Sequence, residues 1–270
     1  IERGDLDRLI RRAERAALAV VEELLGQPWV LDTDVTIKPL YGRQEGAEYG
    51  YNPKKPGRPS HAYHTYWMAR LRLCLDVEVR PGNEHGVNYG LDGLFAWLDA
   101  RPRSQWPQFV RGDCGYGQES VLARCEERNL GYLFKLRRTK NARALLARLE
   151  SAAEAAWQPI GQGWEAAEGE LKLDGWTRRR RVIALRRRLE TAPGPRAERR
   201  RAKRLALPLW ENCGVHATVE VLEYEYQLLV TNLSHEPLTL AVLYRERGDA
   251  ENPFDELKNQ WGWAGFTSRK

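Results

Sequence analysis

The sequence has few cysteines and no long run of apolar residues. Its 270 residues include only four cysteines, Cys74, Cys114, Cys125 and Cys213, far apart and without a CxxC pair. This spacing argues against a disulfide framework and against a zinc finger. No stretch of about 18 apolar residues is present, and the N-terminus lacks the residue order of a signal peptide. We therefore expect a soluble, intracellular protein with no membrane partner.

The chain is basic, with a formal charge of +6 at pH 7 and a pI near 9.2. Because 30% of its residues are charged, this is an excess of cations spread among many acids, which favours a polyanionic partner. Arginines gather at Arg178–Arg181, Arg186–Arg188 and Arg199–Arg201. We expect Arg178, Arg179 and Arg180 to contact DNA phosphates, which would make binding dependent on salt. The alternative is a solvated hairpin whose charge aids solubility.

Hydrophobic periodicity predicts an α/β protein with one mixed sheet flanked by helices. Helices are expected at 6–25, 90–102, 118–129 and from about Leu238. Strands are expected at 29–42, 63–82, 131–136, 164–173, 178–190 and 217–233, the second of them as one long strand or a pair. Residues 106–117 are expected to form a short apolar strand that runs into a glycine-rich turn.

The domain organisation follows from this order of elements. Residues 1–270 are interpreted as one catalytic domain, and 155–235 as a β-rich insertion within it. The chain opens on Ile1 rather than Met and stops at Lys270 soon after a charged helix, so we expect a fragment of a longer chain.

Four residues near the C-terminus combine an acid, two cations and a phenol. They are Tyr244, Arg247, Glu251 and Lys258. On a continuous helix turning about 100° per residue they fall within roughly 60° of one another. A carboxylate flanked by cations suits metal-assisted chemistry on a nucleic-acid backbone. An ordinary solvated face with salt bridges is the alternative for any one of them.

Two further acids stand where strands are expected to end. Asp34 lies in LDTDVTIK and Asp113 in RGDCGYGQE. If neighbouring strands deliver them to one edge of the sheet, three carboxylates converge with Glu251, a ligand set that suits Mg²⁺ or Mn²⁺. Each aspartate alone is also compatible with capping backbone amides in a turn.

Three blocks of sequence carry a resemblance to a known family: LDTDVTIKPLYGRQEGAEYGYNPKKPGRPSHAYH, VRGDCGYGQE and YRERGDAENPFDELKNQWGWAGF. Together they resemble the catalytic blocks of a bacterial DDE transposase from the insertion-sequence group called thirteen-eighty. The last block meets the Y-(2)-R-(3)-E-(6)-K spacing of that superfamily without a gap. The resemblance extends from roughly Leu31 to Phe266 and implies a ribonuclease-H-like core with a mostly β insertion between the second Asp and the Glu.

The resemblance also implies the catalytic residues. Asp34, Asp113 and Glu251 become metal ligands for two Mg²⁺ ions, with Mn²⁺ as a substitute. Asp32 competes with Asp34, which we prefer because Asp34-Val35-Thr36 matches the family pattern more completely.

The implied activity is cut-and-paste transposition. Such an enzyme hydrolyses phosphodiester bonds at transposon ends and transfers the 3′-hydroxyl to target DNA. Its partner is double-stranded DNA, it acts as a homodimer on paired ends, and it resides in the bacterial cytoplasm at the nucleoid. The alternatives are a catalytically inactive, transposase-derived DNA-binding protein and a standalone structure-selective nuclease.

Other predicted DNA contacts come from the resemblance and from an exposed loop. Tyr244, Arg247 and Lys258 are expected to position transposon-end phosphates. Pro253 disfavours a continuous helix, and a new helix that begins there would rotate Lys258 off the shared face. The loop rich in Gly and Pro carries Lys54, Lys55 and Arg58 beside Tyr49 and Tyr51, a mixture suited to following a DNA strand. Four tryptophans in or beside the insertion, Trp157, Trp164, Trp176 and Trp210, are candidates either for core packing or for stacking on an unpaired base.

Overall fold

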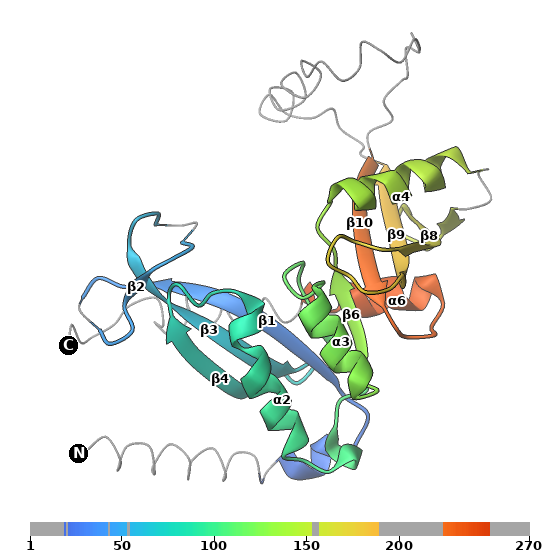
Figure 1. Cartoon of the computed structure of the whole chain (residues 1–270). Helices are drawn as coiled ribbons and strands as arrows, with labels where there is room; N and C mark the ends of the chain where they lie inside the picture. The colour runs from blue at the N-terminus through green and yellow to red at the C-terminus, as the bar shows by residue number, and fades with distance from the viewer. Residues whose placement is uncertain are drawn as a thin grey trace.

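The computed structural model describes residues 19, 21–42, 44–52, 55–152, 157–188 and 224–248. Within these ranges the chain forms one large mixed sheet with helices on both faces (Figure 1). The strands are β1 Val30–Pro39, β2 Glu48–Tyr49, β3 Pro59–Met68, β4 Leu73–Pro81, β5 Phe109–Gly112, β6 Gly131–Lys135, β7 Gln158–Pro159, β8 Trp164–Leu171, β9 Arg180–Arg188 and β10 Tyr224–Thr231. The α-helices are α2 Leu91–Asp99, α3 Glu119–Glu127, α4 Lys140–Ser151 and α6 Pro237–Arg245, and short 3₁₀ turns lie at Val87–Tyr89 and Arg103–Gln105.

The strand order confirms the predicted ribonuclease-H-like core. β1 pairs antiparallel with β3 and parallel with β5, β5 pairs parallel with β6, and β4 pairs antiparallel with β3. The spatial order β4-β3-β1-β5-β6 therefore places three antiparallel strands beside two parallel ones. The crossovers from β4 to β5 and from β5 to β6 contain α2 and α3, as parallel connections require.

The β-rich segment before the last helix continues this sheet. β10 pairs antiparallel with β6 on one side and with β9 on the other, and β8 and β7 follow in order. Strands β7 to β10 are thus joined to the core by backbone hydrogen bonds, and Figure 1 shows them beside α4 and α6.

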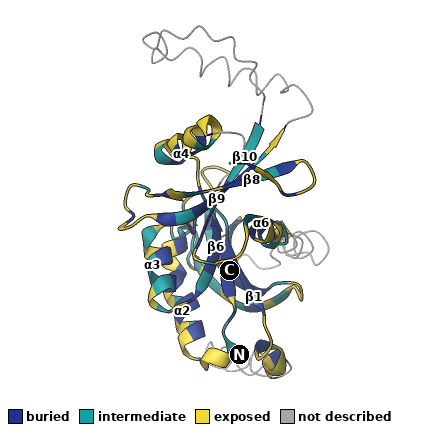
Figure 2. Ribbon diagram, turned by 90° about the vertical axis from the view of Figure 1, so that its right-hand side faces the viewer, coloured by how far each residue is buried: buried dark blue, intermediate teal, exposed yellow. Residues whose placement is uncertain are grey.

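Two apolar layers cover the two faces of the sheet. In α2, Leu91, Leu94, Phe95 and Leu98 are buried at helical spacing. They share a core with α3, α4 and one face of the strands. On the opposite face, α6 contributes Leu240 to a second core that contains side chains of β5, β6 and β9. Figure 2 shows the buried residues gathered along the sheet and the exposed ones on the outer sides of α2, α3 and α4.

Some local predictions need correction or lie outside the described residues. The stretch predicted as one strand or a pair is a pair, because Arg70 and Arg72 adopt positive φ values of 65° and 52° and turn the chain between β3 and β4. Helix α4 has no counterpart among the predicted elements, although Thr139 caps it by accepting a hydrogen bond from the Ala142 amide at 3.3 Å. The helix predicted at 6–25 is described only at 19 and 21–25, which are helical. No helix within the described ranges has the length and apolarity of a membrane span.

Candidate active site

Neighbouring parallel strands bring two of the predicted carboxylates together where β5 ends beside the middle of β1, so Asp34 does not stand at a strand end as the sequence predicted. Asp34 lies in β1, and Asp113 directly follows Gly112, the last residue of β5. Both carboxylates act electrostatically on the same two groups, the Tyr116 hydroxyl and the Arg247 guanidinium. Burial raises the pKa of Tyr116, and the two nearby negative charges raise it further. Asp34 and Asp113 therefore belong to one cluster.

Asp32, two residues before Asp34, has a different environment. Its carboxylate accepts two hydrogen bonds from Arg111, from Nε at 2.6 Å and from Nη2 at 2.7 Å. The Asp32 side chain is 3% exposed and the Arg111 side chain 1%, whereas 31% of the Asp34 side chain is exposed. Arg111 also donates through Nη1 to the Leu243 carbonyl of α6. Burial raises the pKa of Asp32, and the hydrogen bond and charge of Arg111 oppose that rise. This buried pair joins β1, β5 and α6.

The end of α6 adds a cation and a phenol to the cluster. Arg247 Nη2 lies 3.4 Å from Asp34 Oδ1, and the Tyr244 hydroxyl lies 3.5 Å from the Gly112 carbonyl. Burial lowers the pKa of Arg247, but Asp34, Tyr244 and Asp113 together raise it above its ordinary value. Helix α6 ends at Arg245, and the Arg247 amide donates to the Tyr244 carbonyl in a tighter turn. The continuous helix predicted from the spacing is therefore interrupted after Arg245. The Tyr244 side chain still reaches Gly112, and the Arg247 side chain still reaches Asp34.

The turn after Asp113 is tightly held. The Gly115 amide donates to Asp113 Oδ1 at 2.8 Å, and the Tyr116 hydroxyl lies 2.8 Å from Thr33 Oγ1 in β1. A Cβ at Gly112 would stand 2.6 Å from the Tyr116 ring, so only glycine fits at the end of β5. These contacts fix the backbone on which the second carboxylate is carried.

The donor chemistry of the cluster fits a divalent cation, since Asp34 and Asp113 both supply carboxylate oxygens. Within the described ranges, no group of three His, Cys, Asp or Glu residues forms a potential metal site. The third predicted ligand, Glu251, lies outside the described residues, as do Lys54 and Lys258.

The remaining basic residues predicted to bind DNA divide into two groups. Lys55, Arg58, Arg178 and Arg179 are exposed, and the Arg58 guanidinium lies 4.5 Å from the centre of the Tyr41 ring. Arg178 also forms an ion pair with Glu126 at 2.7 Å, although 61% of its side chain is exposed. Arg180, in contrast, is 5% exposed and pairs with two glutamates of α3. The structure therefore gives Arg180 protein carboxylates as partners, and we leave it out of the proposed DNA-binding surface.

The tryptophans of the inserted segment are core residues where the structure describes them. Trp157, Trp164 and Trp176 are 6%, 8% and 4% exposed. Their burial favours the core-packing interpretation over stacking on a base. Trp210 lies outside the described residues.

Arg111 and Tyr116 are residues of the cluster that the sequence did not reveal. Arg111 stands in a short apolar strand, and an arginine in such a strand is the only signal that a buried acid pairs with it. Tyr116 stands in a glycine-rich turn, where a large aromatic residue between two glycines indicates a side chain packed inward.

Comparisons with known proteins show what this chain is similar to. A family model described as transposase DDE domain group 1 matches residues 10–270. No curated protein sequence matches the chain. Among solved structures, one match is a cryo-EM structure of a piggyBac transposase synaptic complex with hairpin DNA, with a TM-score of 0.46 and 10% sequence identity. The match covers 90% of this chain and 43% of that chain, so this chain spans less than half the length of that one.

Proposed function

Because the chain belongs to the family of DDE transposase domains, we propose that it cleaves DNA at the ends of a transposon and joins the freed 3′-hydroxyl to target DNA. The observation that carries this proposal is the cluster of Asp34 and Asp113 on neighbouring strands, with Arg247 3.4 Å from Asp34. The resemblance of the three sequence blocks adds the finer proposal that the element is a bacterial insertion sequence of group thirteen-eighty.

Asp34 and Asp113 are the residues that would hold the divalent metal, with Glu251 as the third ligand. Asp34 suits this role better than Asp32, because both oxygens of Asp32 already accept hydrogen bonds from Arg111. A bound pair of Mg²⁺ or Mn²⁺ ions supplies activation of the attacking oxygen and stabilisation of the leaving oxygen.

Arg247 and Tyr244 act by placement. Arg247 carries a positive charge into a cluster of two carboxylates, where it offsets their repulsion, and 9% of its side chain is exposed beside Asp34. The Tyr244 hydroxyl contacts the Gly112 carbonyl and so aligns the end of α6 with the end of β5. In-line attack requires the scissile phosphate to be held within a fraction of an ångström, which is the contribution of such residues. Lys258 would extend this contact along the phosphate backbone.

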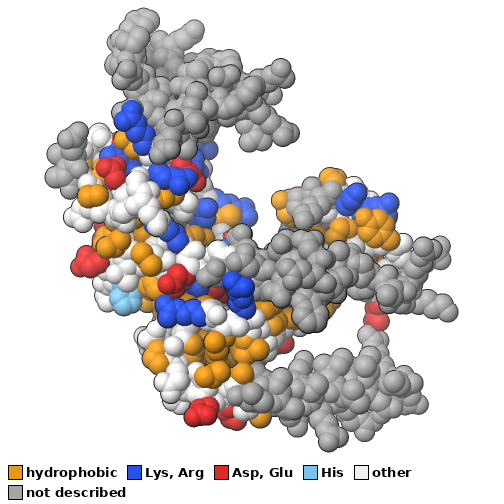
Figure 3. All heavy atoms as spheres, turned by 180° about the vertical axis from the view of Figure 1, so that it is seen from behind, with side chains coloured by type: hydrophobic (Ala, Val, Ile, Leu, Met, Phe, Trp, Pro, Cys, Tyr) orange, Lys and Arg blue, Asp and Glu red, His pale blue; other side chains and the backbone are white. Residues whose placement is uncertain are grey.

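The DNA would approach over exposed cations. Lys55 and Arg58 lie in the loop between β2 and β3, near the exposed rings of Tyr49 and Tyr51. Figure 3 shows basic and hydrophobic side chains together on this projecting loop, and further Lys and Arg side chains over the β-rich part of the molecule. Arg178 and Arg179 are exposed before β9. Two protomers would each bind one transposon end.

The proposal is tested with terminal-repeat DNA from the ends of the element and Mg²⁺ or Mn²⁺. We expect metal-dependent nicks that expose 3′-hydroxyls, followed by joined products when target DNA is added. Asp113→Asn should abolish both, while Asp92→Asn, at a side chain that is 87% exposed on α2, should abolish neither. Nicking without joining would indicate a simple nuclease. Binding of the ends with no nicking by the unaltered protein would indicate an inactive, transposase-derived DNA-binding protein.

A further inference from the structure

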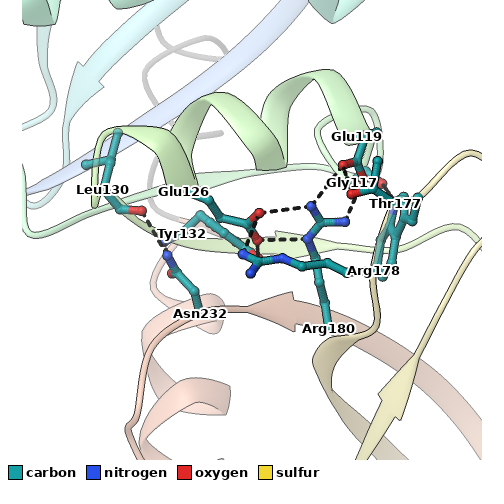
Figure 4. A network of polar contacts seen from close by, with 10 residues as sticks. Gly117, Glu119, Glu126, Leu130, Tyr132, Thr177, Arg178, Arg180 and Asn232 are labelled. Atoms are coloured by element: carbon teal, nitrogen blue, oxygen red, sulfur yellow. Dashed lines mark hydrogen bonds and ion pairs between the residues drawn. The ribbon is translucent and has the colours of Figure 1, made fainter.

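Arg180, the first residue of β9, forms a buried clasp with α3. Its Nε and Nη2 donate to the two carboxylate oxygens of Glu126 at 2.8 and 2.9 Å. Its Nη1 and Nη2 donate to the two oxygens of Glu119 at 2.6 and 3.2 Å. Figure 4 shows the guanidinium between the two glutamates. One side chain of the inserted segment thus binds both ends of α3.

The clasp is a complete network in which each glutamate has further partners. Thr177 Oγ1 donates to Glu119 at 2.6 Å, the Tyr132 hydroxyl donates to Glu126 at 2.8 Å, and Arg178 Nη2 lies 2.7 Å from Glu126 Oε2. The hydrogen bond from Arg180 lowers the pKa of Glu119 to about 2, so this carboxylate is ionised at neutral pH. Forked contacts of this kind are specific to arginine, because a lysine ammonium cannot span two carboxylates with the same geometry.

A second contact from the same segment reaches the turn that carries Asp113. Trp176 is 4% exposed, and its Nε1 donates to the Gly117 carbonyl at 3.1 Å. Gln118 in turn donates to the Gly115 carbonyl at 2.7 Å, and the Gly115 amide donates to Asp113 Oδ1. These three hydrogen bonds, joined by the covalent chain of residues 115–118, connect the indole of Trp176 to the Asp113 carboxylate.

Trp176 and Arg180 contact the chain that follows Asp113 at two residues, Gly117 and Glu119. Glu119 is the first residue of α3, and Asp113 lies six positions before it. The turn is held by β5 before Asp113 and by the contacts at Gly117 and Glu119 after it. These contacts restrict the position of the Asp113 side chain.

We propose that Arg180 and Trp176 are positioning residues that hold the Asp113 turn in its metal-binding geometry, so that the inserted β segment completes the active site from within the protein. The inference rests on the proposed function only in assigning Asp113 to the metal. Both residues are nearly inaccessible to DNA, which separates their role from that of the exposed arginines beside them.

The test compares Arg180→Lys and Trp176→Phe with two matched controls. Arg180→Lys keeps the charge but loses the fork, and Trp176→Phe keeps most of the volume but loses the donor to Gly117. The first control is Arg128→Lys, which alters an arginine fork to Asp99 at the other end of α3. The second is Trp157→Phe, which removes an equivalent indole hydrogen bond, to the Leu149 carbonyl at 3.1 Å.

Hydrogen exchange of the metal-free protein is the primary readout. We expect the amides of residues 113–118 to exchange about fivefold faster in Arg180→Lys and in Trp176→Phe, the effect of one net hydrogen bond. The controls should exchange there at the wild-type rate. The Mn²⁺ concentration for half-maximal cleavage should rise about tenfold in both variants, as for other residues that orient metal ligands.

Wild-type exchange at 113–118 in both variants would overturn the proposal, as would equal acceleration in the controls. The exchange measurement needs neither metal nor DNA. A wild-type protein that never cleaves DNA would refute the proposed function, and the exchange comparison would still decide whether the segment positions the turn.

Discussion

Arg247 Nη2 lies 3.4 Å from Asp34 Oδ1, which places a cation from the end of the last described helix directly beside a carboxylate of the central strand. The two residues are more than 200 positions apart in the sequence, and only the packing of α6 on the sheet brings them together. The Asp34 side chain is 31% exposed, so solvent reaches the carboxylate beside this cation. We therefore regard this pair as the link between the sheet and the predicted C-terminal block.

Removing the Arg247 charge should impair cleavage more than folding. We expect Arg247→Ala to slow cleavage by about 100-fold, the usual effect of losing one preorganised charge at a reacting group. Arg247→Lys should restore part of this loss. Arg245→Ala, which removes the adjacent cation at the end of α6, serves as the control and should change the rate little. Single-turnover cleavage rates check this, and equal effects at the two positions would contradict it.

Breaking the buried pair of Asp32 and Arg111 should cost stability. Asp32→Asn leaves Arg111 buried without a negative partner, so the free energy of unfolding should fall by about 3 to 5 kcal/mol. The comparison is Asp99→Asn, which breaks a surface pair with Arg128 and should cost at most about 1 kcal/mol. Urea denaturation monitored by tryptophan fluorescence measures both. Similar small losses would show that the buried pair does not join the sheet to α6 as we infer.

The clasp on α3 predicts a dependence of stability on pH. The hydrogen bond from Arg180 lowers the pKa of Glu119 to about 2, below the value of about 4.3 expected in the unfolded chain. A lowered carboxyl pKa stabilises the fold above the unfolded value, and this contribution is lost as the pH falls from about 4.3 toward about 2. Glu119→Gln should therefore flatten the acid side of the stability curve. Urea unfolding from about pH 6 to about pH 3 tests this, and an unchanged slope would contradict it.

The loop cations should contribute to DNA affinity without sequence preference. Lys55→Ala and Arg58→Ala should each lower the magnitude of the slope of log K against log salt by about one, because each removes one phosphate contact. Arg124→Ala, on α3 beside Asp92, is the control and should leave the slope unchanged. Fluorescence anisotropy with duplex DNA at several salt concentrations gives the slopes. Slopes equal to wild type for both loop variants would place the DNA elsewhere.

Much of the fold could be predicted because the strands and helices carry their own periodicity. The apolar spacing of α2 predicted that helix, and the order of the predicted elements indicated an α/β layer with a mixed sheet. The ribonuclease-H-like core was implied by the resemblance of the three sequence blocks. The helix α4 was missed although its sequence carries the signals of a helix, since Thr139 is a good cap and Ala142, Leu145 and Leu146 are buried at helical spacing.

The side-chain partners were harder to predict than the strands. The four consecutive arginines 178–181 cannot be distinguished in the sequence, yet Arg180 is buried and Arg179 is exposed. Successive residues of a strand face opposite sides of the sheet, and the pairing register decides which residues face the core. In the same way, Asp32 and Asp34 share one face of β1 and are distinguished by Arg111 on the neighbouring strand. Such choices depend on tertiary contacts that no local pattern encodes.

The most direct measurement is metal-dependent cleavage of terminal-repeat DNA by Asp34→Asn, Asp113→Asn and Glu251→Gln proteins, with DNA binding measured in parallel. The account predicts that all three lose cleavage by several orders of magnitude while their affinity for DNA and their folded fraction stay close to wild type. Cleavage that survives in Asp34→Asn or Asp113→Asn would contradict the account, because the cluster of Asp34 and Asp113 would then not be the site of the chemistry.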